Sequence, residues 1–208
     1  MTRILVATTN PAKLAEYRIL LRGLKLEVLS LRDVAIGEHP EETGATFAEN
    51  ALIKARFYFA RAGIATIADD GGLEVDALGG APGVKSHRWL GAGASNSDAD
   101  LAAEVISRMA GIAPQRRTAR LRAATALIYD HGGKRIERIA EAAIEGTIAP
   151  QVHRAIREGF PYRAVLMVGA PLRYLCEMGP DEAAAISQRR VALKELRPDL
   201  ERIAAAAD

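Results

Sequence analysis

The stretch TRILVATTNPAKLAEYRILLRGLKLEVLS, residues 2–30, decides the fold class of this chain. Residues 3–7 within it form a short apolar run typical of a buried strand, and residues 11–22 carry apolar side chains at helical spacing. Gly23 stands where that helix is expected to stop. Residues 25–30 alternate apolar and polar side chains, which predicts a second strand. The order strand, helix, strand predicts an α/β fold that begins with a β-α-β unit.

The remainder of the chain continues this mixture of helices and strands. At 208 residues it matches a single domain, residues 1–208, because a domain averages roughly 150 residues. No internal repeat or low-complexity block interrupts the pattern. We expect a helix at 47–62, strands at 64–68 and 73–77, a helix at 97–109, a hairpin of strands at 118–129 and 135–143, and a helical tail at 180–207 that is interrupted at Pro198.

The composition excludes several classes of protein. Hydrophobic residues make up 49% and charged residues 26% of the chain, which is typical of a globular protein. The formal net charge of +2 is too small to indicate a nucleic-acid-binding surface. No apolar run approaches the length of a membrane span, and the N-terminal apolar run is shorter than that of a secretory signal, so we expect a cytoplasmic protein. Cys176, the single cysteine, excludes an internal disulfide.

A first candidate site is the turn between the first strand and the first helix. Thr8, Thr9, Asn10 and Lys13 offer hydroxyl groups, backbone N–H groups at a helix N-terminus and one ammonium, which together suit a phosphate. The segment lacks the glycines of a Walker loop. The alternative is that Thr9 or Asn10 only caps the helix, with Pro11 in its favoured first position.

Acidic residues form a second candidate site. Glu41 and Glu42 lie in a turn-rich loop, and Asp69 and Asp70 follow a short buried strand. Carboxylate oxygens of this kind suit Mg²⁺, which keeps the rest of its shell for water and substrate phosphates. Adjacent acids without a cation would repel each other, and this favours a functional role for them. The alternative is that Asp69 and Asp70 cap a turn and that the two glutamates belong to a solvated loop.

The helix expected at 47–62 carries further polar candidates. Thr46 and Glu49 form a capping-box pattern that explains Glu49 without any ligand. Asn50 and Lys54 are four residues apart, so they share one helix face and could both point toward the acidic loop. For Lys54, phosphate binding and an exposed salt bridge are equally open.

Other chemistries find no support in the sequence. The four histidines are scattered without metal-binding spacing, so zinc is not indicated. No G-x-S-x-G motif occurs, and no G-x-G-x-x-G motif follows the first strand. Serine-hydrolase and dinucleotide-dependent oxidoreductase functions are therefore not indicated.

Three runs in this order resemble a known family: ATTNPAK at 7–13, EETGATFAENALIKA at 41–55 and IADDGGLEVDALGGAPGVKSHRW at 67–89. They resemble the inosine triphosphate pyrophosphatase family, the Ham1-like or RdgB-like house-cleaning nucleotide hydrolases. Residues 144–148 and 185–193 are similar to later segments of that family. The likeness covers most of the chain and fades after about residue 150.

This resemblance implies a Ham1- or Maf-like fold, with a central twisted mixed sheet flanked by helices and two lobes around a nucleotide-binding cleft. It also implies a homodimer and Mg²⁺-dependent hydrolysis of inosine, xanthosine or deoxyinosine triphosphate to the monophosphate and pyrophosphate. The residues at 8–13 would then hold the triphosphate. Asp70 would accept the proton of the attacking water, and Glu41, Asp69 and Asp70 would hold Mg²⁺, with Glu42 as the alternative to Glu41.

The chain departs from the family where the base is recognised. Gly71 replaces the usual serine, Arg163 replaces the aspartate of a Phe-Gly-Tyr-Asp segment, Ala183 replaces a lysine and Gln188 replaces a histidine. These changes imply either redirected or broader specificity, or a weakened paralogue that binds nucleotides. A third alternative is a Maf-like hydrolase of modified pyrimidine nucleotides. Arg163 could instead turn toward solvent or phosphates while Phe160 stacks on the base. The substrate-binding residues expected are Thr8, Thr9, Asn10, Lys13, Lys54, Gly71, Phe160, Arg163, Gln188 and Arg189.

Overall fold

The computed structural model describes residues 1–91 and 94–206, and these form two compact units. The first unit comprises Met1–Asp70, Ala123–Ala142 and Arg189–Asp208, and the second comprises Gly71–Arg122 and Ala143–Gln188. Among the described residues, no helix combines the length and apolar character needed to cross a membrane.

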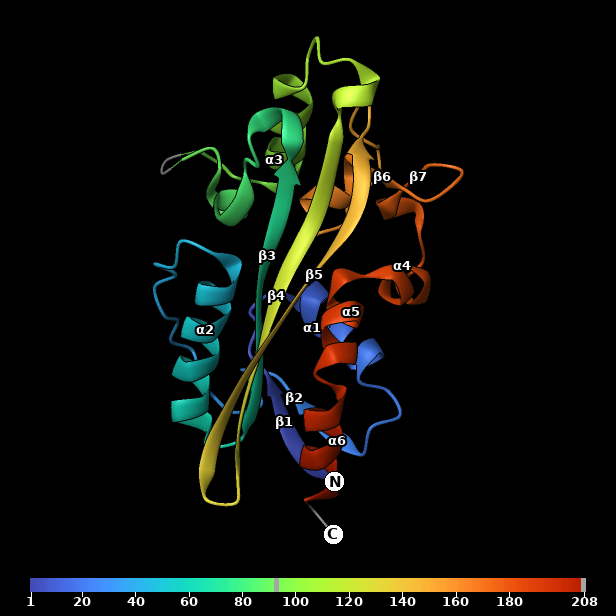
Figure 1. Cartoon of the computed structure of the whole chain (residues 1–208). Helices are drawn as coiled ribbons and strands as arrows, with labels where there is room; N and C mark the ends of the chain where they lie inside the picture. The colour runs from blue at the N-terminus through green and yellow to red at the C-terminus, as the bar shows by residue number, and fades with distance from the viewer. Residues whose placement is uncertain (92–93, 207–208) are drawn as a thin grey trace. The chain divides into compact units, whose positions relative to one another are not determined.

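A seven-stranded mixed sheet organises the chain (Figure 1), in the order β2-β1-β3-β4-β5-β6-β7. Strand β1 pairs in parallel with β2 and β3, whereas the β5–β6 and β6–β7 pairs are antiparallel. This mixed sheet flanked by helices confirms the predicted fold class. Its strands are β1 (Thr2–Val6), β2 (Leu26–Leu29), β3 (Ala65–Val75), β4 (Thr118–His131), β5 (Lys134–Ile148), β6 (Leu166–Val168) and β7 (Arg173–Tyr174).

The predicted β-α-β unit opens the first unit of the structure. Strands β1 and β2 are joined by α1 (Pro11–Leu20), and Ile4 of β1 is in register with Val28 of β2 and with Ala65 of β3. Gly23 has a φ of +86°, a left-handed conformation that glycine adopts without steric cost after a helix. The apolar pattern and the breaker residue therefore predicted this unit correctly.

Helices cover both faces of the sheet in the first unit. In Figure 1, α2 (Phe47–Ala62) lies on one side, and α1, α5 (Gln188–Glu195) and α6 (Arg197–Ala205) lie on the other. The hydrophobic core on the second side joins strand residues such as Ile4 to Tyr17 of α1 and Leu200 of α6. A strand buried on both faces presents every side chain to protein, including the polar ones.

The two strands predicted at 64–68 and 73–77 are wrong as separate elements. They belong to one continuous strand, β3, which runs through the two acids and two glycines at 69–72 without a turn. The interpretation of Asp69 and Asp70 as turn caps is therefore also wrong.

Gly72 explains why the sequence pattern misled. A Cβ atom at this position would lie 1.9 Å from Oγ of Ser86, so the glycine permits close approach rather than a turn. The Ser86 hydroxyl fills that space, accepts a hydrogen bond from the backbone N–H of Leu73 at 3.0 Å and donates one to the Gly83 carbonyl at 2.6 Å.

The second unit contains the expected capped helix α3 (Asp98–Arg108), whose N-cap Ser97 accepts a hydrogen bond from the Asp100 backbone N–H. Strands β4 and β5 form the predicted hairpin, and both are longer than expected. Gly132 and Gly133 supply the two positive φ angles of its turn, +57° and +73°.

The helical tail begins in the second unit with α4 (Pro180–Ile186) and continues with α5 and α6. The chain breaks at Ser187 and Leu196 rather than at Pro198, which lies in the first turn of α6. The predicted break at Pro198 is wrong because proline is well tolerated in a first helical turn, where its missing N–H is not needed.

Arg117 joins the end of α3 to the end of β5 in the second unit. Its guanidinium donates hydrogen bonds to the carbonyl oxygens of Met109, Ile148 and Ala149 at 3.0, 2.9 and 2.7 Å. Hydrogen bonds from a charged group are stronger than neutral ones, so losing several at once is costly.

We expect Arg117→Ala to lower the free energy of unfolding by about 3 kcal/mol, because its charge-assisted hydrogen bonds to backbone carbonyl oxygens are lost together. Urea denaturation followed by circular dichroism measures this change. The matched control is Arg116→Ala, which removes the exposed arginine directly before Arg117. It should leave the free energy of unfolding within about 0.5 kcal/mol of that of the unmodified protein. Equal stabilities for the two variants would contradict the role given to Arg117.

Candidate functional site

The segment at 8–13 combines a helix cap with a buried lysine. Asn10 is the N-cap of α1, and its Oδ1 accepts hydrogen bonds from the backbone N–H groups of Ala12 and Lys13 at 2.9 and 3.2 Å. Thr8 Oγ1 accepts one from the Asn10 backbone N–H at 3.1 Å. The capping alternative thus describes the Asn10 side chain, while Thr9 is exposed. Lys13 turns its side chain into the protein and is buried.

Helix α2 begins with the predicted capping box, in which Thr46 and Glu49 satisfy each other's backbone N–H groups. This confirms the structural role expected for Glu49. The next residue, Asn50, is fully buried, and its Oδ1 accepts a hydrogen bond from the Gly44 backbone N–H at 2.8 Å. Asn50 therefore ties the acidic loop to the first turns of the helix.

The two adjacent aspartates of β3 contact different helices. Asp69 contacts Lys13 and Arg189, from α1 and α5, whereas Asp70 contacts Asn50 and Lys54, both from α2. Successive side chains of a strand point to opposite faces of a sheet, so neighbours in sequence are separated in space. The two aspartates therefore contact different partners, although the charge of Lys54 also acts on Asp69 and lowers its pKa. That both serve one site stays a prediction.

Asp69 lies in a buried array of charges. Its Oδ2 accepts hydrogen bonds from Nε and Nη2 of Arg189 at 3.0 and 2.8 Å, and Lys13 Nζ lies 3.2 Å from the same oxygen. A second anion, Glu16, lies with its Oε2 3.5 Å from Arg189 Nη1. Burial by itself would raise the pKa of Asp69, but the charges of Arg189, Lys13 and Lys54 hold this pKa well below its usual value.

Asp70 is held through both of its oxygens. Oδ2 accepts a hydrogen bond from Asn50 Nδ2 at 3.2 Å, and Oδ1 accepts one from Lys54 Nζ at 3.0 Å. Lys54 Nζ also lies 3.3 Å from Glu42 Oε1. The face shared by Asn50 and Lys54 therefore meets the acidic loop and Asp70, as their spacing in the sequence indicates.

The residues around Lys54 fit a divalent cation. Two carboxylate oxygens, from Glu42 and Asp70, already converge on one positive charge, the Lys54 ammonium. Mg²⁺ takes one or two carboxylates of this kind and completes its shell with water and substrate phosphates. Glu42 and Asp70 are therefore the pair of residues that could hold such an ion.

The expected trio of Glu41, Asp69 and Asp70 does not come together. Glu41 is exposed, and Asp69 faces the opposite side of the sheet from Asp70. In residues 1–91 and 94–206, no three His, Cys, Asp or Glu side chains gather in an arrangement that could hold a metal ion. The structure thus favours the alternative Glu42 over Glu41 and replaces a trio of acids by a pair.

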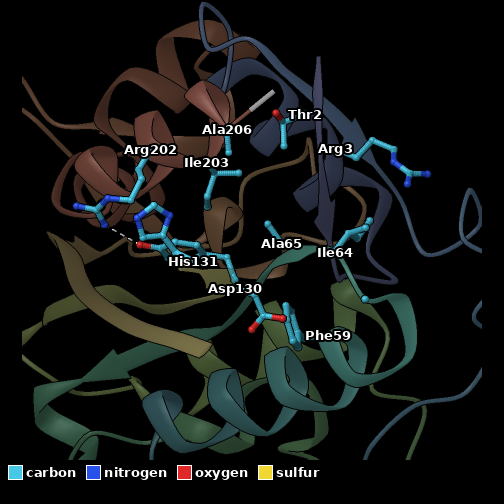
Figure 2. A pocket seen from close by; sticks show the side chains of 12 residues that line it. Thr2, Arg3, Phe59, Ile64, Ala65, Asp130, His131, Arg202, Ile203 and Ala206 are labelled. Atoms are coloured by element: carbon cyan, nitrogen blue, oxygen red, sulfur yellow. Dashed lines mark hydrogen bonds between the residues drawn. The ribbon is translucent and has the colours of Figure 1, made fainter. Parts of the chain in front are cut away.

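A cavity of about 290 Å³ in the first unit lies elsewhere (Figure 2). Phe59, Ile64, Ala65 and Ile203 contribute apolar side chains to its wall, and Arg202, which also lines it, donates a hydrogen bond to the Tyr129 hydroxyl at 2.8 Å. None of the residues predicted for the site lines this cavity. The cavity is therefore not part of the site formed by the acidic and basic residues described above.

Residues 4–199 match the sequence profile of the Ham1 family. The chain belongs to the Ham1 family. A relative from Mycobacterium tuberculosis (strain ATCC 25618 / H37Rv), named dITP/XTP pyrophosphatase, is 39% identical over 207 residues that cover 98% of each chain. A relative of the same name from Porphyromonas gingivalis (strain ATCC BAA-308 / W83) is 38% identical over 95% of this chain and 96% of its own.

Solved structures of the Ham1 family support the same assignment. The structure of a HAM1 protein from Coxiella burnetii matches with a TM-score of 0.81 and 34% identity, over 97% of this chain and 100% of the other. The crystal structure of the nucleoside-triphosphatase / dITP/XTP pyrophosphatase from Mycobacterium abscessus matches with a TM-score of 0.70 and 40% identity, over 95% and 100%.

The second unit contains most residues at which this Ham1 chain departs from the usual pattern. Arg163 is buried, and its guanidinium carbon lies 3.8 Å from the centre of the Phe160 ring. The alternative in which Arg163 turns toward solvent is therefore wrong, because stacking on an aromatic ring keeps it inside. Gln188 is buried with its Oε1 lacking a hydrogen-bond partner, and Gly71 lies within strand β3. The predicted roles of these residues toward substrate stay predictions.

Glu16 is the residue of this array that the sequence analysis missed. Its side chain is buried on the face of α1 that also contains Lys13 and Tyr17. Lys13 and Glu16 are three residues apart, and a pair of opposite charges on a face next to a buried tyrosine is the signal that could have identified it.

We expect the side-chain carboxyl carbon of Asp69 to keep the chemical shift of an ionised carboxylate down to pH 3. An aspartate of ordinary pKa is about 90% protonated there, whereas Arg189 and Lys13 lower the pKa of Asp69. Since the pKa is lower in the folded than in the unfolded protein, the ionised group adds stability at neutral pH that is lost as the pH falls through the lowered pKa. Carbon-13 NMR measures this shift, with Asp69→Asn for assignment, and a titration midpoint above pH 3 would contradict the expectation.

Proposed function

We propose that the chain is a Mg²⁺-dependent nucleoside triphosphate pyrophosphatase that hydrolyses non-canonical purine nucleotides, such as inosine, xanthosine and deoxyinosine triphosphates, to the monophosphate and pyrophosphate. The observation that carries this proposal is the joining of the two predicted segments in one unit: Lys13 of the phosphate segment lies 3.2 Å from Asp69, and the charges of Lys54 and Asp70 both act on the pKa of Lys13, which burial lowers. The name dITP/XTP pyrophosphatase, given to relatives of nearly equal length, supports the same reaction.

The proposed division of labour follows from the charges. Lys13 and Lys54 bind the phosphate chain, and their ammonium groups stabilise the charge that develops on the leaving pyrophosphate. Asp70 accepts the proton of the attacking water through a carboxylate that Asn50 holds in position. Glu42 and Asp70 hold Mg²⁺, which when bound neutralises phosphate charge and favours a reactive water.

The base is proposed to be recognised by residues of the second unit. Phe160 and Arg163 offer an aromatic ring and a planar cation, and Gln188 offers an unpartnered amide oxygen. A site that hydrogen-bonds a base through buried polar groups discriminates strongly against bases that leave those groups unpaired. Because these residues differ from the family pattern, we expect the range of accepted bases to be broader than is usual in the family. The homodimer and the cytoplasmic location stay predictions.

The proposal is tested by measuring pyrophosphate release with Mg²⁺ across a panel of nucleoside triphosphates that includes inosine, xanthosine, canonical, thymidine and methylated pyrimidine nucleotides. We expect the highest rates with the inosine and xanthosine triphosphates. Binding of nucleotides without release from any of them would instead support a nucleotide-binding paralogue, and the highest rates with modified pyrimidines would support a Maf-like activity.

Asp70→Asn is expected to lower kcat for the preferred nucleotide at least about a hundredfold, because a general base alone typically contributes 10² to 10⁴. The variant keeps the shape of the side chain, so its circular dichroism spectrum should be unchanged. A loss of less than tenfold, measured as pyrophosphate release in a folded sample, would exclude Asp70 as the base.

A pair of neighbouring substitutions distinguishes the two candidate metal ligands. We expect Glu42→Gln to raise the Mg²⁺ concentration required for half-maximal rate at least about tenfold, since even outer-shell partners of a metal are worth roughly 10–100-fold in affinity. Glu41→Gln, which changes an exposed side chain, should leave that concentration within about twofold. The reverse order of effects in Mg²⁺ titrations of the rate would return the role to Glu41.

A further inference from the structure

The Lys54 ammonium lies between the two proposed ligands of the divalent cation. Its Nζ lies 3.0 Å from Asp70 Oδ1 and 3.3 Å from Glu42 Oε1, the two groups proposed to hold the divalent cation. The Lys54 side chain is only 13% exposed, so solvent screens this contact poorly. A positive charge of the chain itself therefore occupies the place between the two acids.

A divalent cation and the Lys54 ammonium would compete for the same two carboxylates. Mg²⁺ binds carboxylate oxygens at roughly 2.0–2.1 Å, so an ammonium that stayed 3.0–3.3 Å from those oxygens would lie within a few ångströms of the ion. Charges of the same sign at such a distance repel strongly where screening is weak. This repulsion favours the departure of one of the two cations from Glu42 and Asp70.

Asp70 is anchored by a second donor, Asn50, whereas the Lys54 ammonium is able to change partners. Asp70 Oδ2 accepts a hydrogen bond from Asn50 Nδ2, and Asn50 is fixed in turn because its Oδ1 accepts one from the Gly44 backbone N–H. The Asp70 carboxylate therefore keeps a donor when Lys54 departs. Lysine carries its charge on a flexible four-carbon chain, so its ammonium can pass to another anion nearby.

We propose that the Lys54 ammonium exchanges between two sets of anions, the carboxylates of Glu42 and Asp70 in the free protein and the phosphates of the bound nucleotide. This inference rests on the proposed function, because it takes a nucleoside triphosphate as the second set of anions. The arriving phosphates withdraw Lys54 from the two acids and leave their oxygens available to Mg²⁺. Lys54 thereby couples the binding of the metal ion to the binding of the nucleotide.

The coupling has a direct consequence for the free protein. Because Lys54 competes for the same oxygens, a divalent cation binds weakly until a nucleotide is present. Binding free energies are reciprocal, so the same contact makes the nucleotide bind better when the metal is present. Lys13 does not share this role, because its carboxylate partner, Asp69, is not one of the two residues proposed to hold the cation and accepts two hydrogen bonds from Arg189.

The experiment measures the binding of Mn²⁺ alone, without nucleotide, from the electron paramagnetic resonance signal of the free ion. Lys54→Met should bind Mn²⁺ at least about tenfold more tightly than the unmodified protein, since a neighbouring like charge has been removed. Lys54→Arg keeps the charge and should stay within about twofold of the unmodified protein. Lys134→Met, which removes an exposed lysine of the same unit and changes the net charge equally, should also stay within about twofold.

Two further measurements make the outcome decisive. Adding Glu42→Gln to Lys54→Met should abolish the gain in Mn²⁺ affinity, and Lys54→Gln serves as a second neutral variant if the methionine variant does not fold. The inference is overturned if both neutral variants bind Mn²⁺ no more tightly than Lys134→Met. Pyrophosphate release by the unmodified protein is measured in parallel, because its absence overturns the proposed function, whereas its presence together with unchanged Mn²⁺ affinity overturns the role of Lys54 alone.

Discussion

The alternation of side chains along β3 is the constraint on which the charged part of this structure depends. Asp69 and Asp70 are both buried, and two adjacent ionised carboxylates on one face would repel each other. The strand instead directs them to opposite faces, where each meets cations from different helices. A buried carboxylate is tolerated only when it is paired. Helices α1 and α5 therefore have to supply cations beside Asp69, and α2 has to supply one beside Asp70.

This arrangement explains why the helices on the two faces contribute differently. On the face of Asp69, the charges of Lys13, Arg189 and Glu16 form a well-buried set, in which Arg189 donates two hydrogen bonds to one Asp69 oxygen. Breaking such a set by removing one partner is costly, which suits a rigid support. On the face of Asp70, the contacts are made by one neutral amide and one flexible ammonium, and the nearby Glu42 is partly exposed. The second face is therefore the one that is able to rearrange.

Local patterns predicted the elements of the fold, and long-range packing decided what the patterns could not. The capping box and Gly63 delimit α2 in the sequence at the same residues, Phe47–Ala62, at which the structure has it. By contrast, Gly72 looked like part of a turn because a sequence does not reveal the Ser86 side chain that lies against it. Similarly, Glu41 and Glu42 are adjacent residues of the same type, and only the position of Lys54 in space distinguishes them. Residues beyond about 150, such as Gln188, could be related to a site only through the family resemblance.

The close packing of Gly44 also limits how the acidic loop can vary. A Cβ atom there would lie 2.6 Å from the Glu49 Cβ and 2.7 Å from Asn50 Oδ1, so any larger residue would lift the loop from the start of α2. Lifting the loop would carry Glu42 with it, two residues away. The absence of a side chain at Gly44 therefore determines how close the Glu42 carboxylate can come to Lys54.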